Sequence, residues 1–456
     1  MKEMFNGLVN NMLFWMAWII IPLMMEIVPA IFGSLLLIKK KIFSPKVEEP
    51  VKFPEIDIIV PVYNSAKTLM RCIKSINDSD YANELISVIV VNNGSKDDSF
   101  EIFCECQQKF SDLSMKWLSS RQGKSKALNM AVFNSHAKYI INIDSDGVLY
   151  KDALSNIIRK FENTRDMDCC TGAVLVDSDL VKKTKKFSRK ILRQCEMMEY
   201  FQAFLAGRNF QAESNSIYTL SGAFSAFRKS TLLKTQLYNT ETICEDTQVT
   251  FQIKKLLNKK VDICENAFFF VEPIDDFNKL YTQRQRWQRG ELEVSHMFLK
   301  NNAKEQKNIL ADSMLRVLLF DHTFAFPRMI WYFALICLMF MNYSVKTIVF
   351  SVLILYSLYV IVSILYFLNI CMYLKNYKKL RHEYFSKFYI LFILPIYNFI
   401  VYFIRLAGII NSINTDSTWR TRTLSDEAVT ATKIIASDFL WFKKIRKKAK
   451  KLVNQD

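Results

Sequence analysis

The stretch Ile56-Asp57-Ile58-Ile59-Val60-Pro61-Val62-Tyr63 decides the fold of this chain. It is a nearly continuous apolar run, as expected for a strand that a parallel sheet buries on both faces. Three further strands of this kind are predicted at residues 86–91, 115–118 and 139–143. Helices are predicted between these strands, at residues 65–76, 97–110 and 124–134. This alternation predicts an α/β domain whose strands form a doubly wound parallel sheet.

Polar residues follow three of these strands. They are Tyr63-Asn64, Asn92-Asn93-Gly94-Ser95 and Asp144-Ser145-Asp146. Because ligands bind at the carboxyl ends of parallel strands, we expect these residues to gather at one site. The two aspartates suit a hard divalent cation that bridges the phosphates of a nucleotide. The alternative is structural, since Asp-Ser-Asp-Gly is also favourable turn chemistry.

Glu245-Asp246 is the candidate acid–base pair. A reaction in which a hydroxyl group attacks needs a carboxylate that takes the hydroxyl proton, and we assign this role to Asp246. Glu245 would hold Asp246 in place or raise the pKa of Asp246 by like-charge repulsion. The alternative is that both residues only favour the N-terminus of a helix through its dipole.

Gln283-Arg284-Gln285-Arg286-Trp287 lies about forty positions further on. Arg286 suits a leaving diphosphate, because a guanidinium matches phosphate oxygens. Trp287 offers a flat apolar face to a sugar ring. The alternative is a basic amphipathic helix on a membrane surface, with Arg284, Arg286 and Arg289 as solvated or lipid-facing charges.

Gly123-Lys124 precedes a predicted helix and suits a phosphate at the helix N-terminus. The spacing is not that of a P-loop, which argues against an ATPase.

The formal net charge is +17, and Lys and Arg gather beside apolar segments, as at the cytosolic ends of membrane helices. No nucleic-acid-binding signature is present. The ten cysteines lack metal-ligand spacing and are expected to be reduced structural thiols.

The apolar segments predict a protein of the plasma membrane that crosses it several times. Residues 11–38 read as a signal anchor, residues 314–324 as an interfacial helix, and residues 326–342, 346–373 and 388–411 as spans. Because segment 388–411 contains Pro395 and Asn398, the alternative for it is an interfacial or re-entrant helix that does not cross the membrane. Lys39–Lys41 and loop 374–387 place the catalytic domain in the cytosol. The side of the basic tail remains open.

The expected organisation follows from these segments. The parts are an anchor (1–43), a linker (44–55), a catalytic domain (56–300), an interfacial region (301–325), membrane helices (326–411) and a basic tail (412–456).

Taken together, the motifs resemble those of processive family-two glycosyltransferases, which include the cellulose, hyaluronan and chitin synthases. The resemblance is strongest to bacterial poly-N-acetylglucosamine synthases. The stretches that carry it are Val60–Asn64, Gly123–Asn129, Asp144–Asp146, Ser221–Arg228, Glu245-Asp246 and Gln283–Trp287. The Asn92-Asn93 pair also resembles a Gram-positive group of transferases found beside an exosortase-like protease.

The resemblance implies a GT-A domain, with a doubly wound mixed sheet, joined to transmembrane helices. It implies Mg²⁺ or Mn²⁺ as cofactor, held by Asp144 and Asp146. The implied donor site comprises Pro61, Tyr63, Asn64, Asn93, Lys124, Asp144, Gln283 and Arg286. The implied acceptor site comprises Gly222, Phe224 and Trp287, beside the catalytic Asp246 and Glu245. The implied partners are a UDP-sugar, a glycan or lipid-linked acceptor, the bilayer, and an export or accessory protein.

Two departures from the family pattern leave three functions open. Asn92-Asn93 stands where the family has Asp-Asp, and Gln248 stands where it often has a second acid. The first hypothesis is transfer of N-acetylglucosamine from a UDP donor to a growing polysaccharide, coupled to export. The second is a single addition to a lipid or protein. The third is an inactive nucleotide-sugar sensor or scaffold.

Overall fold

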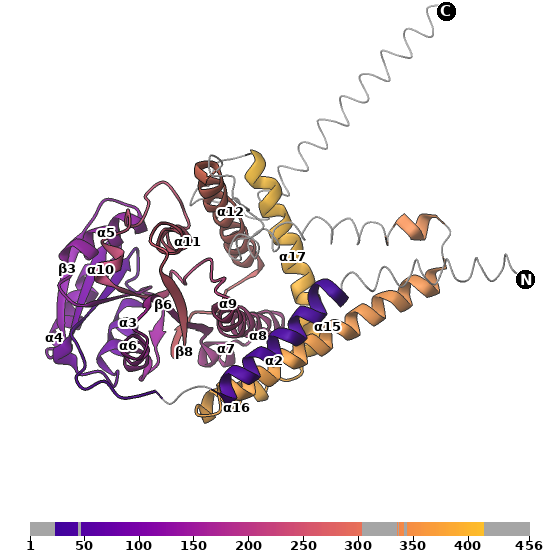
Figure 1. Cartoon of the computed structure of the whole chain (residues 1–456), viewed down its shortest axis with the longest axis horizontal. Coiled ribbons are helices and arrows are strands. Elements are labelled where there is room, and N and C mark those ends of the chain that lie inside the picture. The colour runs from indigo at the N-terminus through magenta and orange to yellow at the C-terminus, as the bar shows by residue number, and fades with distance from the viewer. Residues whose placement is uncertain (1–22, 44–46, 303–334, 336, 342–343, 415–456) are drawn as a thin grey trace, which may run out of the picture.

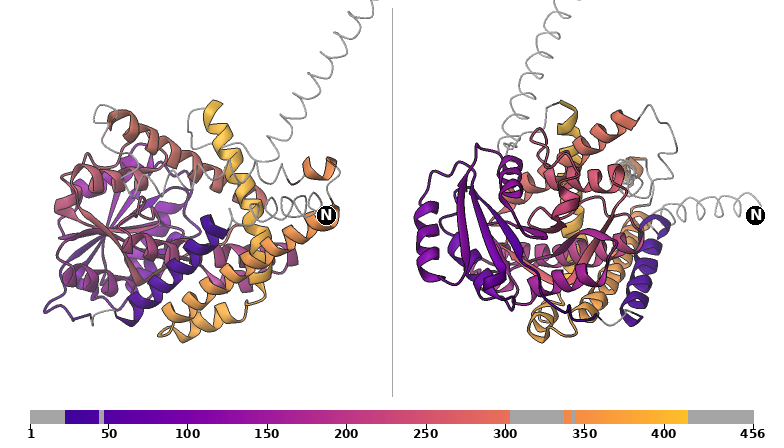
Figure 2. Two further views of the ribbon diagram at one scale, coloured as in Figure 1. Left: turned by 45° about the vertical axis from the view of Figure 1, so that its right-hand side comes forward. Right: turned by 60° about the vertical axis from the view of Figure 1, so that its left-hand side comes forward.

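The computed structural model describes residues 23–43, 47–302, 335, 337–341 and 344–414. The predicted membrane segments 11–38 and 326–342 are therefore described only in part. The interfacial segment 314–324 and the tail from residue 415 lie outside the described residues. A sheet domain occupies one side of the molecule, and long helices pack along the other (Figures 1 and 2).

The first half of the domain alternates strands and helices as predicted. Its elements are β1 (Ile56–Val62), α3 (Leu69–Asn77), η2 (Asn83–Leu85), β2 (Ile86–Asn92), α4 (Ser99–Lys109), β3 (Ser114–Ser119), α5 (Lys124–Asn134) and β4 (Tyr139–Ile143). The four strands are parallel, in the spatial order β3-β2-β1-β4. β1 is buried along its whole length, which explains its apolar sequence.

The second half turns the parallel sheet into a mixed one of eight strands. It adds β5 (Val148–Leu149), β6 (Met167–Val176), β7 (Phe224–Arg228) and β8 (Lys260–Val271). β7 lies between β4 and β6 and is antiparallel to both. A purely parallel sheet is therefore wrong for the domain as a whole, whereas the mixed sheet of a GT-A domain is confirmed.

Helices cover both faces of the sheet. The remaining helices of the domain are α6 (Ala153–Asn163), α7 (Ser178–Lys182), α8 (Phe187–Phe201), η3 (Gln202–Gly207), α9 (Arg208–Glu213), α10 (Lys229–Leu232), α11 (Glu245–Phe251), η4 (Gln252–Leu256) and α12 (Phe277–Asn302). Side chains of α3, α6 and α8 pack on one face, and side chains of α5, α11 and η4 pack on the other. Both faces are thereby closed to water, as an open parallel sheet requires.

The helices outside the sheet domain are η1 (Leu23–Ile27), α2 (Val28–Ile42), α15 (Val345–Tyr373), α16 (Lys378–Phe385) and α17 (Ile390–Asn414). By length and composition, α15 and the Ile390–Ser412 part of α17 are long and apolar enough to cross a membrane. They match the predicted spans 346–373 and 388–411. α17 is one continuous helix through Pro395. α2 packs on α15, where Asn369 Nδ2 donates to Ser34 Oγ at 3.1 Å.

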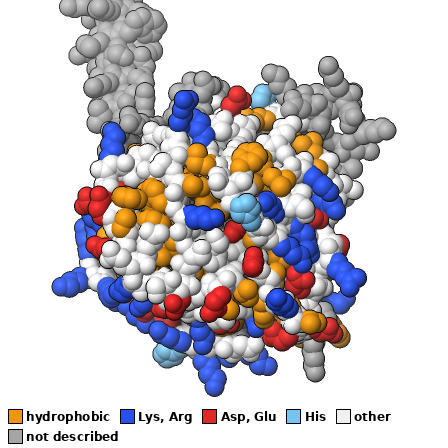
Figure 3. Space-filling view, turned by 90° about the vertical axis from the view of Figure 1, so that its left-hand side faces the viewer, with side chains coloured by type: hydrophobic (Ala, Val, Ile, Leu, Met, Phe, Trp, Pro, Cys, Tyr) orange, Lys and Arg blue, Asp and Glu red, His pale blue; other side chains and the backbone are white. Residues whose placement is uncertain are grey.

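Basic side chains gather where α15 and α17 approach each other. Exposed lysines of this region are Lys182, Lys183, Lys185, Lys186, Lys378 and Lys379. Of these lysines, Lys182 pairs with Asp179 and Glu383. Lysines at this end of α15 and α17 agree with charges that flank membrane helices. On the face that Figure 3 shows, Lys and Arg side chains are likewise interspersed with Asp and Glu.

Candidate active site

Lys124 is the centre of the cluster of charges that the sheet brings together. It is the first residue of α5, directly after Gly123, whose φ of +136° favours glycine. Its Nζ donates to Asp144 Oδ1 at 2.6 Å and to the Gly222 carbonyl at 3.2 Å, and lies 3.5 Å from Glu245 Oε1. Burial opposes the charge of the ammonium, but the nearby carboxylates outweigh it and hold the pKa of Lys124 well above its usual value.

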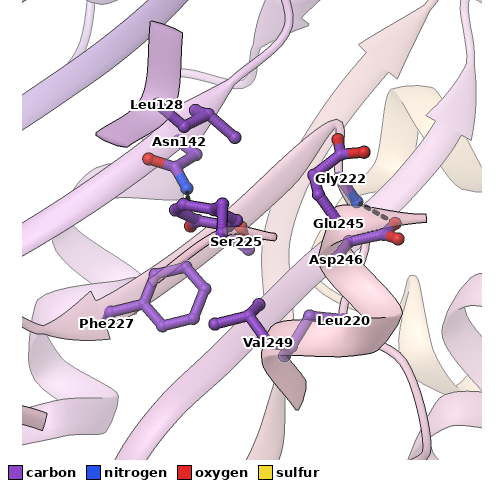
Figure 4. A pocket seen from close by; sticks show the side chains of 10 residues that line it. Leu128, Asn142, Leu220, Gly222, Ser225, Phe227, Glu245, Asp246 and Val249 are labelled. Atoms are coloured by element: carbon purple, nitrogen blue, oxygen red, sulfur yellow. Dashed lines mark hydrogen bonds between the residues drawn. The ribbon is translucent and has the colours of Figure 1, made fainter. Parts of the chain in front are cut away.

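Asp246 is held at the start of α11 by backbone N–H groups. Its Oδ2 accepts from Gly222 N at 3.0 Å, and its Oδ1 accepts from Thr247 N at 2.7 Å. Figure 4 shows the first of these contacts. A Cβ atom on Gly222 would lie only 3.0 Å from Asp246 Oδ2, so a glycine permits this close approach. The carboxylate is therefore fixed in one orientation.

Glu245 differs from its neighbour in its surroundings. It is buried, at 6% exposure, and burial raises its pKa although the Lys124 ammonium opposes that shift. It faces Lys124 and so links α11 to α5. This contact supports a positioning role for Glu245.

A small pocket adjoins these two carboxylates (Figure 4). Its lining residues are Leu128, Asn142, Leu220, Gly222, Ser225, Phe227, Tyr238, Glu245, Asp246 and Val249. Asn142 Nδ2 donates to Tyr238 Oη at 2.5 Å, while Asn142 Oδ1 has no hydrogen-bond partner among the described residues. Neither Asn142 nor Tyr238 belongs to a polar motif, so the sequence analysis did not identify them.

Asp144 and Asp146 follow β4 on one tight loop. Gly147 N donates to the Asp144 carbonyl at 3.4 Å, and Ser145 Oγ lies 2.7 Å from Ser65 Oγ. Partial desolvation, and after it the charge of Asp144, raise the pKa of Asp146 to about 6. A cation beside two repelling carboxylates would relieve that repulsion, so the pair fits a divalent metal. Within the described ranges, no group of three or more His, Cys, Asp and Glu residues forms a closed metal site. A metal held by Asp144 and Asp146 would take its other ligands from water or from a substrate.

The asparagines that replace the family's acidic pair support the loops. Asn93 Oδ1 accepts from Gly123 N at 2.5 Å, and Asn92 Oδ1 accepts from Ser95 N at 2.8 Å. Asn93 thus fixes the glycine that precedes Lys124. Tyr63 is 49% exposed at the same sheet edge, and Asn64 binds the neighbouring loop through Ser95 and Lys96.

Two predicted site residues lie in the core. Pro61 is buried within β1, opposite Val91 of β2. Phe224 is fully buried, and its ring packs on Phe269 at 5.6 Å between centroids. Assigning the Phe224 side chain to the acceptor surface is wrong, because the pairing of β7 with β4 directs it inward.

The Gln283–Trp287 motif lies on α12. Arg284 is 2% exposed, and its Nε donates to Glu199 Oε1 at 3.1 Å and its Nη2 to Glu199 Oε2 at 2.5 Å. Tyr397 Oη of α17 also donates to this carboxylate, at 2.7 Å. Arg289 is buried as well. The alternative of a helix with solvated or lipid-facing arginines is therefore wrong for Arg284 and Arg289.

The other motif residues lie around this ion pair. Gln283 Oε1 accepts from Arg284, and Gln283 Nε2 lies 3.5 Å from Tyr200 Oη. Trp287 is half-buried, with the Arg284 guanidinium 4.4 Å from its ring centroid and the Phe204 ring edge-on at 5.8 Å. Arg286 is half-buried on the same helix. The sequence analysis did not identify Glu199, because Arg284, with which it pairs, lies 85 residues away.

Comparison with known proteins defines the class. Residues 57–234 match the sequence profile of the family described as "Glycosyl transferase family 2". With the mixed sheet and the ordered motifs, this match shows that the chain carries a glycosyltransferase domain of family two with a GT-A fold.

Particular relatives agree with this class. The chain is 24% identical over 306 residues to a poly-beta-1,6-N-acetyl-D-glucosamine synthase of Staphylococcus epidermidis, covering 67% of each protein. It is 23% identical over 239 residues to the synthase of that name from Staphylococcus aureus (strain COL), covering 52% of this chain and 55% of the relative. The latter match thus spans about half of that relative's length. The solved mannosyltransferase of Pyrobaculum calidifontis shares the fold, with a TM-score of 0.54 and 15% identity over 82% of this chain and 97% of that chain.

Proposed function

We propose that this protein transfers N-acetylglucosamine from a UDP donor to the end of a growing β-linked polysaccharide at the cytosolic face of the plasma membrane. The geometry of Asp246 carries the proposal, because two backbone N–H groups fix its carboxylate close to the Lys124–Asp144 ion pair. The names of the staphylococcal relatives support the choice of sugar and of a polymeric product.

The donor would bind at the carboxyl edge of the parallel strands. Exposed Tyr63 would face the base, and the loops of Asn64 and Asn93 would contact the nucleoside. Lys124 would bind phosphate as a permanent cation. Asp144 and Asp146 would hold Mg²⁺ or Mn²⁺, and the bound metal would neutralise the diphosphate. The mannosyltransferase of the same fold was solved with GDP-Man and Mn²⁺.

Transfer would proceed by a single inverting displacement. The acceptor hydroxyl attacks the anomeric carbon of the donor while the bond from that carbon to the diphosphate oxygen breaks. Asp246 takes the hydroxyl proton, and the nucleoside diphosphate leaves with the bonding electron pair. Arg286 and Gln283 would stabilise the leaving diphosphate, and Trp287 would support the acceptor sugar.

The membrane helices would receive the product. α12 carries the motif and packs along α17, where Arg405 Nε donates to Gln288 Oε1 at 2.7 Å. This contact supports growth of the chain next to a membrane helix and export coupled to synthesis. A second candidate is a single addition to a lipid or protein acceptor, since a site beside a membrane helix would serve such an acceptor equally well.

The test is donor turnover by the full chain purified in detergent. UDP- and GDP-linked sugars are supplied with Mg²⁺, Mn²⁺ or EDTA, and released nucleotide and product length are measured. Metal-dependent release of UDP from UDP-N-acetylglucosamine, with a long product, is the expected result. Short or lipid-linked products at long incubation would establish the single-addition alternative. Turnover of a GDP-sugar alone would refute the donor assignment.

A further inference from the structure

Arg208, the first residue of α9, is a buried cation at the side of the candidate site. It is 7% exposed, and its Nη1 has no hydrogen-bond partner among the described residues. Burying a guanidinium without such a partner is costly. The cost falls if a ligand supplies the missing acceptor atom.

The surroundings of Arg208 are those of a carbohydrate subsite. Its guanidinium carbon lies 5.9 Å from the ring centroids of both Phe204 and Tyr218. Phe204 in turn packs edge-on against Trp287. Tyr218 Oη donates to Glu291 Oε1 at 3.4 Å. Aromatic faces beside a planar donor and a carboxylate match a sugar, which presents apolar C–H faces and a rim of oxygen atoms.

The backbone fixes Arg208 in this position. A π-helical turn, η3, ends at Gly207 directly before it, and such turns are frequent at functional sites. α2 holds α9 from another side, since Lys40 Nζ donates to Asn209 Oδ1 at 3.3 Å and pairs with Glu213 at 2.8 Å. The guanidinium is thus placed by α9, which packs on α2, and α2 in turn packs on the candidate membrane span α15.

The local charges favour a neutral ligand. Burial lowers the pKa of Arg208, and the Tyr218 hydroxyl and the carboxylates of Asp246 and Glu291 oppose that shift. The two carboxylates already exceed the charge of the one cation. A phosphate or uronate group would meet their repulsion, whereas a hydroxyl or acetamido oxygen would not.

We propose that Arg208 is a specificity-determining residue of the acceptor subsite, where its Nη1 donates a hydrogen bond to a neutral oxygen of the terminal acceptor sugar. This inference rests on the proposed function, because it takes the acceptor to be a glycan. Arg208 and Trp287 then contact the same sugar, and Asp246 receives the proton of its attacking hydroxyl.

The test compares the purified full-length protein with its Arg208→Gln and Arg208→Lys variants. Binding of a short β-linked N-acetylglucosamine oligosaccharide is measured by tryptophan fluorescence, and transfer is measured at varied donor and acceptor concentrations. Arg208→Gln is expected to weaken acceptor binding and raise the acceptor KM about tenfold, with the donor KM changed less than about twofold. Arg208→Lys keeps the charge without the planar fork and should have an intermediate effect. Arg189→Gln, an exposed change on α8, is the matched control.

Each outcome decides one of the two proposals. Sugar transfer by the wild type, with equal acceptor KM in the wild type and both variants, overturns the role of Arg208 and leaves the proposed function intact. Equal rises in donor and acceptor KM assign Arg208 a structural role and also overturn it. Tighter binding of a phosphorylated or uronate-ended oligosaccharide than of the neutral one contradicts the neutral ligand. Failure of the wild type to transfer any sugar refutes the proposed function. It also refutes the role of Arg208, which depends on that function.

Discussion

The proposed donor side and the proposed acceptor side of the site are built in different ways. On the donor side, short loops directly after β1, β2 and β4 present Tyr63, Asn93 and Asp144. On the acceptor side, helices from distant parts of the chain meet, as Tyr397 of α17 and Glu199 of α8 do across 198 positions. A site at strand ends follows from local sequence, whereas a site between helix faces depends on tertiary packing. Three substitutions sharpen this contrast.

The largest expected effect comes from Asp246, which lies between the two sides. Asp246→Asn keeps the shape of the side chain and removes the base, so transfer should fall about 10³-fold. The measurement is the rate of nucleotide release and product formation with saturating donor and acceptor. Asp166→Asn, at an exposed position, is the control. Transfer at the wild-type rate by Asp246→Asn would rule out this mechanism.

The next effect concerns the acceptor side alone. Arg284→Met leaves Glu199 without its buried partner and removes the guanidinium from Trp287, and should cost about 3 kcal/mol of unfolding free energy. The observable is a lower melting temperature in detergent. Removing both charges, in Arg284→Met with Glu199→Gln, should cost less than the sum of the single changes. Additive losses would show that the pair is not coupled.

The smallest effect is a pH dependence on the same side. Glu196 of α8 is fully buried and accepts from Ile274 N at 2.9 Å, with Arg284, Glu199 and Arg193 as its charged neighbours. Burial, partly opposed by Arg284, raises its pKa to about 7. The pKa of Glu196 in the folded protein therefore lies above its usual value of 4.5. The stability that Glu196 contributes is fully present below pH 4.5 and is lost as the pH rises through 7.

Glu196→Gln removes this titration. Above pH 7 the variant should melt at a higher temperature than the wild type. The gain in unfolding free energy should be no more than about 3 kcal/mol, and it should shrink towards pH 4.5. Melting curves across this range test the sign, and exposed Glu105→Gln is the control. A difference that is constant with pH would show that Glu196 does not titrate in the folded protein.

Much of the donor side was predictable. Helix α5 begins at Lys124 and ends at Asn134, as its apolar spacing indicates, and the strands before Tyr63 and Asp144 lie where apolar runs place them. The ion pair of Lys124 with Asp144 follows from their common sheet edge. The support that Asn93 gives to Gly123 was not predictable, because an amide at a strand end gives no sign of its partner.

The sequence by itself determined the resemblance to a class of enzyme, the positions of the parallel strands along the chain and the candidate carboxylates, because apolar runs, helical patterns and strand-end motifs are local properties. Only the tertiary structure decided that β7 enters antiparallel, that Phe224 points into the core, that Arg284 is buried, and that Arg208 lies beside Phe204 and Tyr218. The physical reason is that these outcomes depend on which distant surfaces exclude water together. No local pattern in the chain encodes that choice.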